Sequence, residues 1–212
     1  MSEMSYGPEQ FQAETSVSRE TLERFETWRR LLEETSAHTN LVGRGTLAEF
    51  WHRHALDSWQ VLELMPDAAR WADLGAGAGF PGLAIAFGLM ERGVEAGHVL
   101  MVDSVAKKMA FVNQVIRETK APAIARADRV ESIHPVPEMD VVTARAMAPL
   151  GKLLGYVHPF VEKGAVALLP KGARYNEELT EARKSWTFEA EVLPSRTSPE
   201  AAILKIRGLA RV

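Results

Sequence analysis

Residues 71–82 read Trp71-Ala72-Asp73-Leu74-Gly75-Ala76-Gly77-Ala78-Gly79-Phe80-Pro81-Gly82, and one helix-length later residues 100–104 read Leu100-Met101-Val102-Asp103-Ser104. The first stretch predicts a short apolar strand that ends in alternating glycines and then opens an apolar helix. Glycines let a backbone approach a ligand at places where any Cβ atom would collide with it. The pattern therefore predicts an α/β domain that binds a nucleoside cofactor.

Two classes of nucleoside cofactor fit this stretch to different degrees. Gly77-x-Gly79-x-x-Gly82 matches the GxGxxG fingerprint of dinucleotide-binding proteins, in which the first glycine follows the strand directly and a pyrophosphate lies at the helix N-terminus. Here Asp73 and Gly75 come first, and Pro81 removes one N–H donor that a phosphate would use. The pattern Asp-x-Gly-x-Gly-x-Gly resembles motif I of class I methyltransferases instead, whose cofactor S-adenosylmethionine carries no phosphate. An NAD(P) site and a glycine-rich turn without ligand stay open as alternatives.

Composition sets limits on the class of protein. The 212 residues, 46% of them hydrophobic, suffice for one large domain with an accessory segment. We expect a cytoplasmic protein without a membrane span, because no apolar run approaches the ~20 residues that a span needs and the first residues lack a signal-peptide pattern. The chain has no cysteine, which excludes a disulfide-linked partner, thiolate zinc sites and cysteine nucleophiles.

The charge distribution bears on a nucleic-acid partner. A formal net charge of -3 argues against one, since such partners usually require a basic surface. Basic residues nevertheless concentrate at Arg29-Arg30, His52-Arg53-His54, Lys107-Lys108 and Lys171 with Arg174. Each of these runs is more typical of a solvated helix face than of a binding patch. Composition alone therefore leaves the partner open.

The chain divides into an N-terminal helical segment, residues 1–66, and an α/β domain, residues 67–212. We expect the first ~15 residues to be frayed, since they lack periodicity. Ser18 is placed to cap an amphipathic helix, and a second helix is predicted from Leu47 to about Leu64, with Pro66 just beyond its end. This segment is too short and too amphipathic to fold alone, so we expect it to pack on the domain that follows.

From Arg70 onward strand-type and helix-type patterns alternate, which is typical of βαβ units and a largely parallel sheet. We expect strands near residues 70–75, 98–103, 122–127, 139–144, 164–169, 186–193 and 201–207. We expect helices near residues 80–92, 104–119, 129–133, 148–159 and 173–185. The last two strands are so close in sequence that they suggest an antiparallel hairpin. The predicted fold is the Rossmann-like seven-stranded sheet of class I S-adenosylmethionine-dependent methyltransferases.

Ligands of open α/β sheets bind at the carboxyl ends of the strands, so residues at these ends are candidates for the site. Asp103 is expected to accept the ribose hydroxyls, the alternative being that it caps the following helix. Arg145 ends an apolar strand and must reach a carboxylate, a phosphate or water; an ion pair with Asp103 or Glu131 is the alternative to a ligand contact. Lys171 follows the fifth strand and suits a phosphate.

His54, Asp57 and Ser58 share one face of the second helix. A His–Asp pair suggests a general base, but no nucleophilic serine motif or cysteine accompanies it. We therefore favour a buried structural cluster of hydrogen bonds. The histidines are scattered singly, and His52 and His54 point to different helix faces, so we expect no metal site.

The motifs as a set resemble one family, RsmG, also called GidB, from about residue 25 to the C-terminus. They are, in chain order, Asn40-Leu41, Arg53-His54-x-Leu56-Asp57-Ser58, Asp73-Leu74-Gly75-x-Gly77-x-Gly79-Phe80-Pro81-Gly82, Val102-Asp103-Ser104-x-x-Lys107-Lys108, Arg129-Val130-Glu131, Ala144-Arg145-Ala146 and Lys171-Gly172. The resemblance implies an enzyme that uses S-adenosylmethionine to methylate N7 of a guanine in bacterial 16S ribosomal RNA. Its partner would be that RNA or the small ribosomal subunit.

The resemblance also implies roles for individual residues. The residues expected to contact the cofactor are Gly75, Gly77, Phe80, Asp103, Val130, Glu131 and Arg145. The residues expected to border the site are His54, Asp57, Arg145 and Lys171, while the catalytic residue itself stays unassigned. A methyltransferase acting on a small molecule and a non-catalytic Rossmann-type nucleotide-binding protein remain the rival hypotheses.

Overall fold

The computed structural model describes residues 6–36, 41 and 47–212. Asn40, which belongs to one of the motifs above, lies outside these residues. The prediction of a frayed N-terminus is wrong for the described part, because Pro8–Thr15 forms helix α1. Phe11 explains the error, since this one side chain is fully buried against the rings of Phe25 and Trp51 and so anchors a helix without sequence periodicity.

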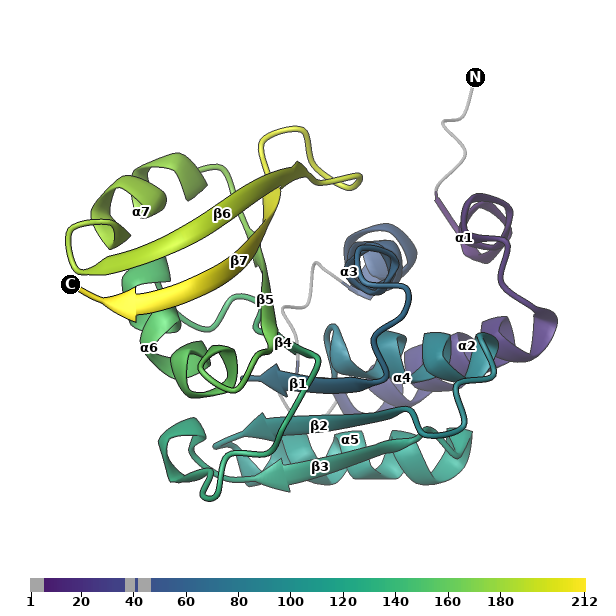
Figure 1. The fold of residues 1–212 in the computed structure, drawn as a ribbon. Coiled ribbons are helices and arrows are strands. Elements are labelled where there is room, and N and C mark those ends of the chain that lie inside the picture. The colour runs from purple at the N-terminus through teal and green to yellow at the C-terminus, as the bar shows by residue number, and fades with distance from the viewer. Residues whose placement is uncertain (1–5, 37–40, 42–46) are drawn as a thin grey trace.

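A seven-stranded sheet forms the centre of the fold, in the order β3-β2-β1-β4-β5-β7-β6 (Figure 1). The strands are β1 Arg70–Leu74, β2 His98–Asp103, β3 Ala123–Ala127, β4 Val141–Thr143, β5 Val166–Lys171, β6 Trp186–Pro194 and β7 Ala202–Arg211. Neighbouring strands from β3 to β5 pair parallel, while β7 pairs antiparallel with both β5 and β6. The predicted fold class and the terminal hairpin are confirmed.

Helices cover both faces of the sheet (Figure 1). They are α2 Arg19–Ser36, α3 Asp57–Glu63, α4 Gly82–Glu91, α5 Ala106–Thr119, α6 Leu150–Val161 and α7 Tyr175–Ala182, with a 3-10 turn η3 at Val130–Ser132. Residues of α1 to α5 share one apolar core with one face of the sheet, and residues of α6 and α7 share a second core with the other face. The N-terminal helices thus pack on the α/β core, as expected, whereas the domain boundary between residues 66 and 67 stays a prediction. No described helix is long and apolar enough to cross a membrane.

The segment before α3 departs from a regular α-helix. Leu47–Glu49 forms a 3-10 turn, η1, and Phe50–Leu56 forms a π-helix, η2, which continues directly into α3. π-Helical turns are rare and often occur at functional sites. The wider turn also changes which side chains of residues 50–57 share a face, and sequence periodicity does not reveal this.

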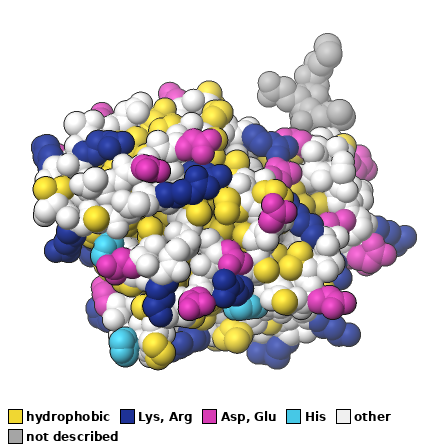
Figure 2. Space-filling model, in the orientation of Figure 1, with side chains coloured by type: hydrophobic (Ala, Val, Ile, Leu, Met, Phe, Trp, Pro, Cys, Tyr) yellow, Lys and Arg dark blue, Asp and Glu magenta, His cyan; other side chains and the backbone are white. Residues whose placement is uncertain are grey.

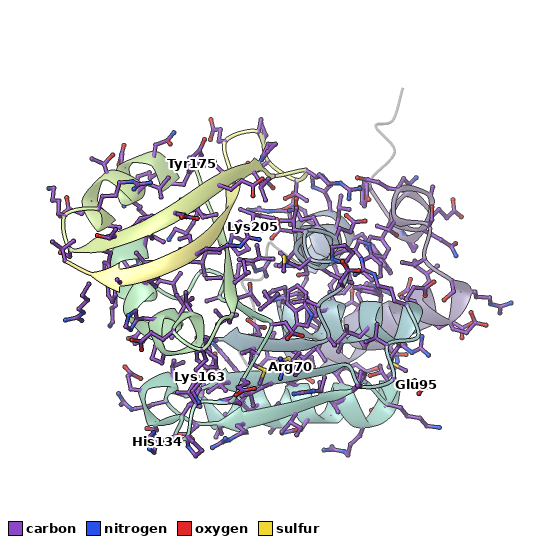
Figure 3. The ribbon with its side chains drawn as sticks, viewed as in Figure 1. Arg70, Glu95, His134, Lys163, Tyr175 and Lys205 are labelled. Atoms are coloured by element: carbon purple, nitrogen blue, oxygen red, sulfur yellow. The ribbon has the colours of Figure 1, made fainter. Side chains whose placement is uncertain are left out.

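The two edges of the parallel strands differ in character. At the amino edge, Arg70 donates from Nε and Nη2 to Oδ1 of Asp140 at 3.1 and 2.7 Å, and the N–H groups of Ala69 and Arg70 donate to Oδ2 of the same carboxylate (Figure 3). These contacts fasten the starts of β1 and β4 together. The carboxyl edge carries the glycine loop, Asp103 and Arg145, so the candidate site lies there.

Candidate functional site

The glycine loop after β1 is held against the end of β2. The N–H groups of Gly75 and Ala76 donate to the carbonyl of Val102 at 2.7 and 3.1 Å, and the N–H of Gly77 donates to Oδ2 of Asp103 at 3.0 Å. Gly75 has φ +70°, and a Cβ there would lie 2.9 Å from Cγ of Met147. The close approach and the backbone conformation both require glycine at this position.

The carboxylate of Asp103 holds the backbone at two places. Oδ2 accepts from Gly77, and Oδ1 accepts the N–H of Val105 at 2.8 Å, which orders the entry to α5. Lys108 lies 3.9 Å from Oδ2. A carboxylate has several lone-pair sites, so Asp103 keeps capacity to accept hydroxyl donors. Its capping role therefore does not exclude the predicted ribose contact.

Asp73 lies beneath the loop and is fully buried. Its Oδ2 accepts the N–H of Gly82 at 2.8 Å, whereas Oδ1 has no hydrogen-bond partner among the described residues. Burial raises the pKa of Asp73 to about 7, although the hydrogen bond from Gly82 and the charge of Arg145 act in the opposite direction. A buried acid with an unused oxygen at the loop is typical of a functional site.

A cavity of about 410 Å³ opens beside the glycine loop. Four of the residues predicted to hold the cofactor line it, namely Gly75, Asp103, Val130 and Glu131. Ser104, Val105, Lys108, Asp128, Arg129, Ala146, Met147 and Tyr156 complete the lining. The volume and this mixture of apolar and polar groups suit a nucleoside-sized ligand. We call it the loop cavity.

Gly77, Phe80 and Arg145, also predicted to contact the cofactor, are not among the lining residues of the loop cavity. The Phe80 ring is buried between Trp28, with ring centroids 4.4 Å apart, and His54, whose ring is stacked on it at 4.5 Å. The Arg145 guanidinium lies 4.9 Å above the same ring. Phe80 thus packs against His54 and Arg145, which line a second cavity.

That neighbouring cavity, which we call the rim cavity, has a volume of about 430 Å³. Segments far apart in sequence form it: the η2–α3 segment, the ends of β4 and β5, α7, and the loop between β6 and β7. All four predicted site-bordering residues, His54, Asp57, Arg145 and Lys171, line it. Ala146, which has φ +53°, lines both cavities and so forms part of the wall of each.

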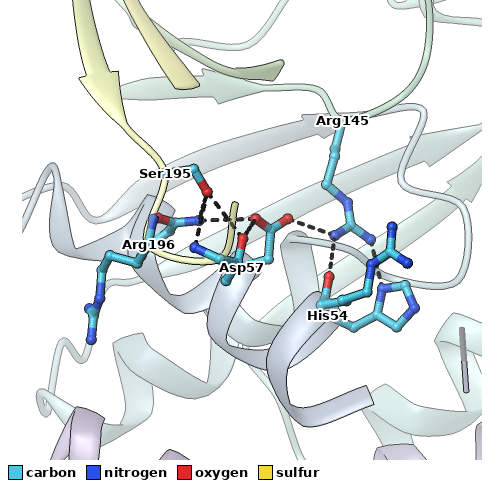
Figure 4. A network of polar contacts seen from close by, with 8 residues as sticks. His54, Asp57, Arg145, Ser195 and Arg196 are labelled. Carbon is cyan, nitrogen blue, oxygen red and sulfur yellow. Dashed lines mark hydrogen bonds and ion pairs between the residues drawn. The ribbon is translucent and has the colours of Figure 1, made fainter. Parts of the chain in front are cut away.

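Arg145 forms its ion pair with Asp57, and not with Asp103 or Glu131, which were the alternatives to a ligand contact. Its Nη1 donates to Oδ2 of Asp57 at 2.9 Å and to the carbonyl of Arg53 at 3.3 Å, and Nη2 lies 3.2 Å from Nδ1 of His54 (Figure 4). Asp57 begins α3 directly after the π-helical segment, and its carboxylate reaches the side chain that follows β4. The remaining N–H groups of Arg145 have no partner among the described residues.

His54 belongs to this cluster and is 9% exposed. Burial, together with the charge of Arg145, lowers the pKa of His54 to about 4. The neutral ring accepts from Arg145 at Nδ1 and therefore carries its proton on Nε2, an atom that has no partner among the described residues. His54 and Asp57 both bond Arg145, and no direct hydrogen bond joins them within the described residues. The structural role that the sequence favoured for this cluster stays a prediction.

Lys171 is engaged rather than open to a phosphate. Its Nζ lies 2.6 Å from Oε2 of Glu178 and donates to the carbonyl of Ala148 at 3.2 Å, and its side chain is only 10% exposed. Glu178 also accepts the N–H of Leu150 at 2.6 Å. The cation thus ties β5 to α7 and to the segment after Ala146.

Sequence reasoning missed three residues of the rim cavity region. Thr197 donates from Oγ1 to Oδ1 of Asp57 at 2.7 Å, Gln60 donates to the same oxygen at 3.0 Å, and Glu178 neutralises Lys171. Thr197 and Glu178 lie in segments with ordinary loop and helix patterns. Only Gln60 carried a signal, namely its position one turn after Asp57 in the same helix.

Comparison with known proteins places the chain in a family. A family model described as rRNA small subunit methyltransferase G, GidB, matches residues 21–203. The chain belongs to the GidB family. It is 45% identical to the ribosomal RNA small subunit methyltransferase G of Hyphomonas neptunium over 95% of this chain and 94% of the relative, and 46% identical to that of Parvibaculum lavamentivorans over 95% and 89%. The GidB resemblance read from the motifs is confirmed.

Solved structures agree on the fold of this GidB chain. A methyltransferase of Podospora anserina with bound SAH covers 94% of each chain with a TM-score of 0.59 at 13% identity. The magnesium protoporphyrin IX methyltransferase of Synechocystis with bound SAM covers 91% of this chain and 98% of its own, with a TM-score of 0.52 at 13% identity. Both share the class I methyltransferase architecture, which confirms the fold class predicted from the glycine loop.

Proposed function

We propose that this chain transfers the methyl group of S-adenosylmethionine to N7 of a guanine in 16S ribosomal RNA, either free or in the small subunit, in the cytoplasm. Membership of the GidB family supports a ribosomal RNA methyltransferase. The observation that carries the proposal to this chain's own residues is the pair of cavities that share Ala146 in their walls. One cavity suits the cofactor, and the other suits a base.

The loop cavity fits S-adenosylmethionine on the residues present. Gly75 offers backbone without a side chain, Asp103 offers acceptor positions for ribose hydroxyls, and Val130 with Glu131 offers an apolar and a polar contact for the adenine. No phosphate-binding group is required, in agreement with Pro81 at the helix entry. The cofactor supplies an electrophilic methyl group on a sulfonium.

The rim cavity fits a guanine oriented by Arg145. The free N–H groups of Arg145 suit the O6 acceptor, which lies beside N7 on the same edge of the base. Phe80 and His54 hold the guanidinium in place from below. With O6 at Arg145, N7 faces the boundary at Ala146, the residue that follows Arg145 in the chain.

The chemistry needs no general base. Guanine N7 presents a lone pair in the plane of the ring, so the N7–C bond forms as the C–S bond breaks, and the positive charge moves from sulfur to the purine. Alignment of the two reactants and exclusion of water then supply catalysis. The roles of the protein groups in this scheme are binding and orientation, and neutral His54 with its low pKa is consistent with a structural role.

Transfer of labelled methyl from S-adenosylmethionine to purified 16S RNA and to small subunits tests the proposal, with the product base identified by mass spectrometry. We expect 7-methylguanine, and rates that fall steeply with salt. Lys107→Ala removes an exposed cation beside the loop cavity and should lower the salt slope of RNA binding by about one unit if it contacts a phosphate.

Labelling of small-molecule acceptors but of no ribosomal substrate, with intact cofactor binding, would favour a small-molecule methyltransferase. The surface charge does not favour RNA over a small molecule, because acidic and basic side chains are interspersed on the face shown in Figure 2. The net charge of -3 points the same way.

A further inference from the structure

The loop between β6 and β7, residues 195–201, reaches across the rim cavity to helix α3. Thr197 at its centre donates from Oγ1 to Oδ1 of Asp57 at 2.7 Å, and it does so across 140 positions of sequence. Thr197 is also held within its own loop, because its N–H donates to Oγ of Ser195 at 3.2 Å. The hydroxyl is therefore aimed at Asp57 by its own loop.

Asp57 shares its two carboxylate oxygens among three partners. Oδ1 accepts from Thr197 and, at 3.0 Å, from Nε2 of Gln60, while Oδ2 accepts from Arg145 at 2.9 Å. The Asp57 and Arg145 side chains are 19% and 18% exposed, so water competes little for these contacts. The hydroxyl of Thr197 thus helps to fix the plane of the Asp57 carboxylate, which orients the Arg145 guanidinium. Figure 4 shows Asp57 beside Arg145.

The loop itself has other fastenings. The N–H of Arg196 donates to Oε1 of Gln60 at 2.9 Å, and its guanidinium forms ion pairs with Glu63 of α3 and, at 2.6 Å, with Glu14 of α1. These contacts hold the loop on the N-terminal helices without help from Thr197. The loop therefore has contacts to the N-terminal helices that do not involve the Thr197 hydroxyl.

We propose that Thr197 is a positioning residue for methyl transfer, acting through Asp57 to set the direction in which Arg145 presents its free N–H groups to the base. This inference rests on the proposed function, because it assigns the guanine to the rim cavity. Without the hydroxyl, Oδ1 of Asp57 keeps only Gln60, the carboxylate gains rotational freedom, and Arg145 samples more orientations. Thr197 itself touches neither reactant.

The kinetic test compares Thr197→Val, which replaces the hydroxyl by a methyl group of similar size, with Thr197→Ser, which keeps it. In methyl transfer to small subunits, Thr197→Val should lower kcat about tenfold with KM for the RNA changed less than twofold, because phosphate contacts elsewhere dominate RNA affinity. Thr197→Ser should restore most of the rate. Thr187→Val, the same change at an exposed position of β6, is the matched control.

A double-mutant cycle separates positioning from general damage. We call the contacts from Thr197 through Asp57 to Arg145 the relay. In an Arg145→Lys background the relay has no guanidinium to orient, so Thr197→Val should add little to the loss of kcat already present. An equal fold-loss in both backgrounds would overturn the proposal, as would a Thr197→Val variant with unchanged kcat. The affinity for S-adenosylhomocysteine, measured by calorimetry, should stay within twofold of wild type in every Thr197 variant.

A spectroscopic readout tests the relay without any RNA. In NMR spectra, the Nε and Nη resonances of Arg145 are assigned by their loss in Arg145→Lys. Their line widths report how freely the guanidinium moves. Thr197→Val should alter them and Thr197→Ser should not. Unchanged resonances in Thr197→Val refute the relay even if methylation is observed, whereas altered resonances with no methylation of ribosomal RNA by the wild type refute the proposed function and leave the relay standing.

Discussion

Asp103 accepts the N–H of Gly77 at 3.0 Å, which links the end of β2 to the glycine loop after β1 across 26 positions of sequence. Residues from Glu91 to Gly97 lie at the end of α4 and in the turn after it, and the parallel register of β1 and β2 is continuous from Arg70 opposite His98 to Leu74 opposite Val102. This register places Asp103 beside the glycine loop.

Asp103→Ala should weaken binding of S-adenosylhomocysteine by about 1.5–3 kcal/mol, the range for hydrogen bonds to charged groups. Because Gly77 and Val105 also lose an acceptor, the ligand-free protein should lose about 1–2 kcal/mol of stability as well. Calorimetry gives the first quantity and urea unfolding the second. Loss of stability with affinity per folded molecule intact would mean that Asp103 only orders the backbone.

Gly75→Val should abolish cofactor binding. Its φ of +70° disfavours a side chain, and the Cβ would meet Met147 on the wall of the loop cavity. Gly77→Val should have a similar effect through its φ of +57°, although the only described atom within 4 Å of its Cβ is the carbonyl oxygen of Gly75 at 3.9 Å. Gly164→Ala, at φ +97° far along the chain, controls for backbone strain alone. If Gly75→Val bound the cofactor with wild-type affinity, the glycine loop would not be part of the cofactor site.

His54 should make stability fall in acid. Its pKa is about 4 in the folded protein against 6.5 for the exposed group, so the unfolded chain takes up a proton first and the free energy of unfolding drops as the pH falls from 6.5 toward 4. Between pH 7.5 and 5 the loss due to this group should be about 2 kcal/mol.

His54→Phe keeps a ring against Phe80 and cannot titrate, so this variant should lose correspondingly less stability between the same two pH values. Urea unfolding of both proteins measures the difference, which cancels the contributions of other groups. His98→Phe, at an exposed position, controls for removal of a histidine. Identical pH dependence in His54→Phe and wild type would contradict the buried neutral ring.

Lys171→Met should destabilise the protein by about 2 kcal/mol, because it leaves Glu178 partly buried with only the N–H of Leu150 as partner. The double variant Lys171→Met, Glu178→Gln should recover part of this loss in urea unfolding. A variant with unchanged stability whose RNA binding loses one unit of salt slope would show instead that Lys171 meets a phosphate.

Local patterns sufficed for much of the fold. Alternating apolar stretches and glycines located every strand to within a few residues. Strand and helix periods and turn residues depend only on residues close together in the sequence. These patterns did not predict α1, which is anchored by the buried ring of Phe11 and has no periodic apolar face. They also did not predict the π-helical turn before α3, where the number of residues per turn changes.

The sequence by itself determined the glycine loop, the acid at the end of β2 and hence the class of cofactor, because these residues act through backbone geometry at the ends of strands whose order follows from the alternating pattern. Only the tertiary structure decided which charges meet. Arg145 pairs with Asp57 across 88 positions, and Thr197 reaches the same carboxylate across 140. Such pairings depend on how a helical cap and a distant hairpin pack over one sheet edge, and no spacing between residues along the chain records that.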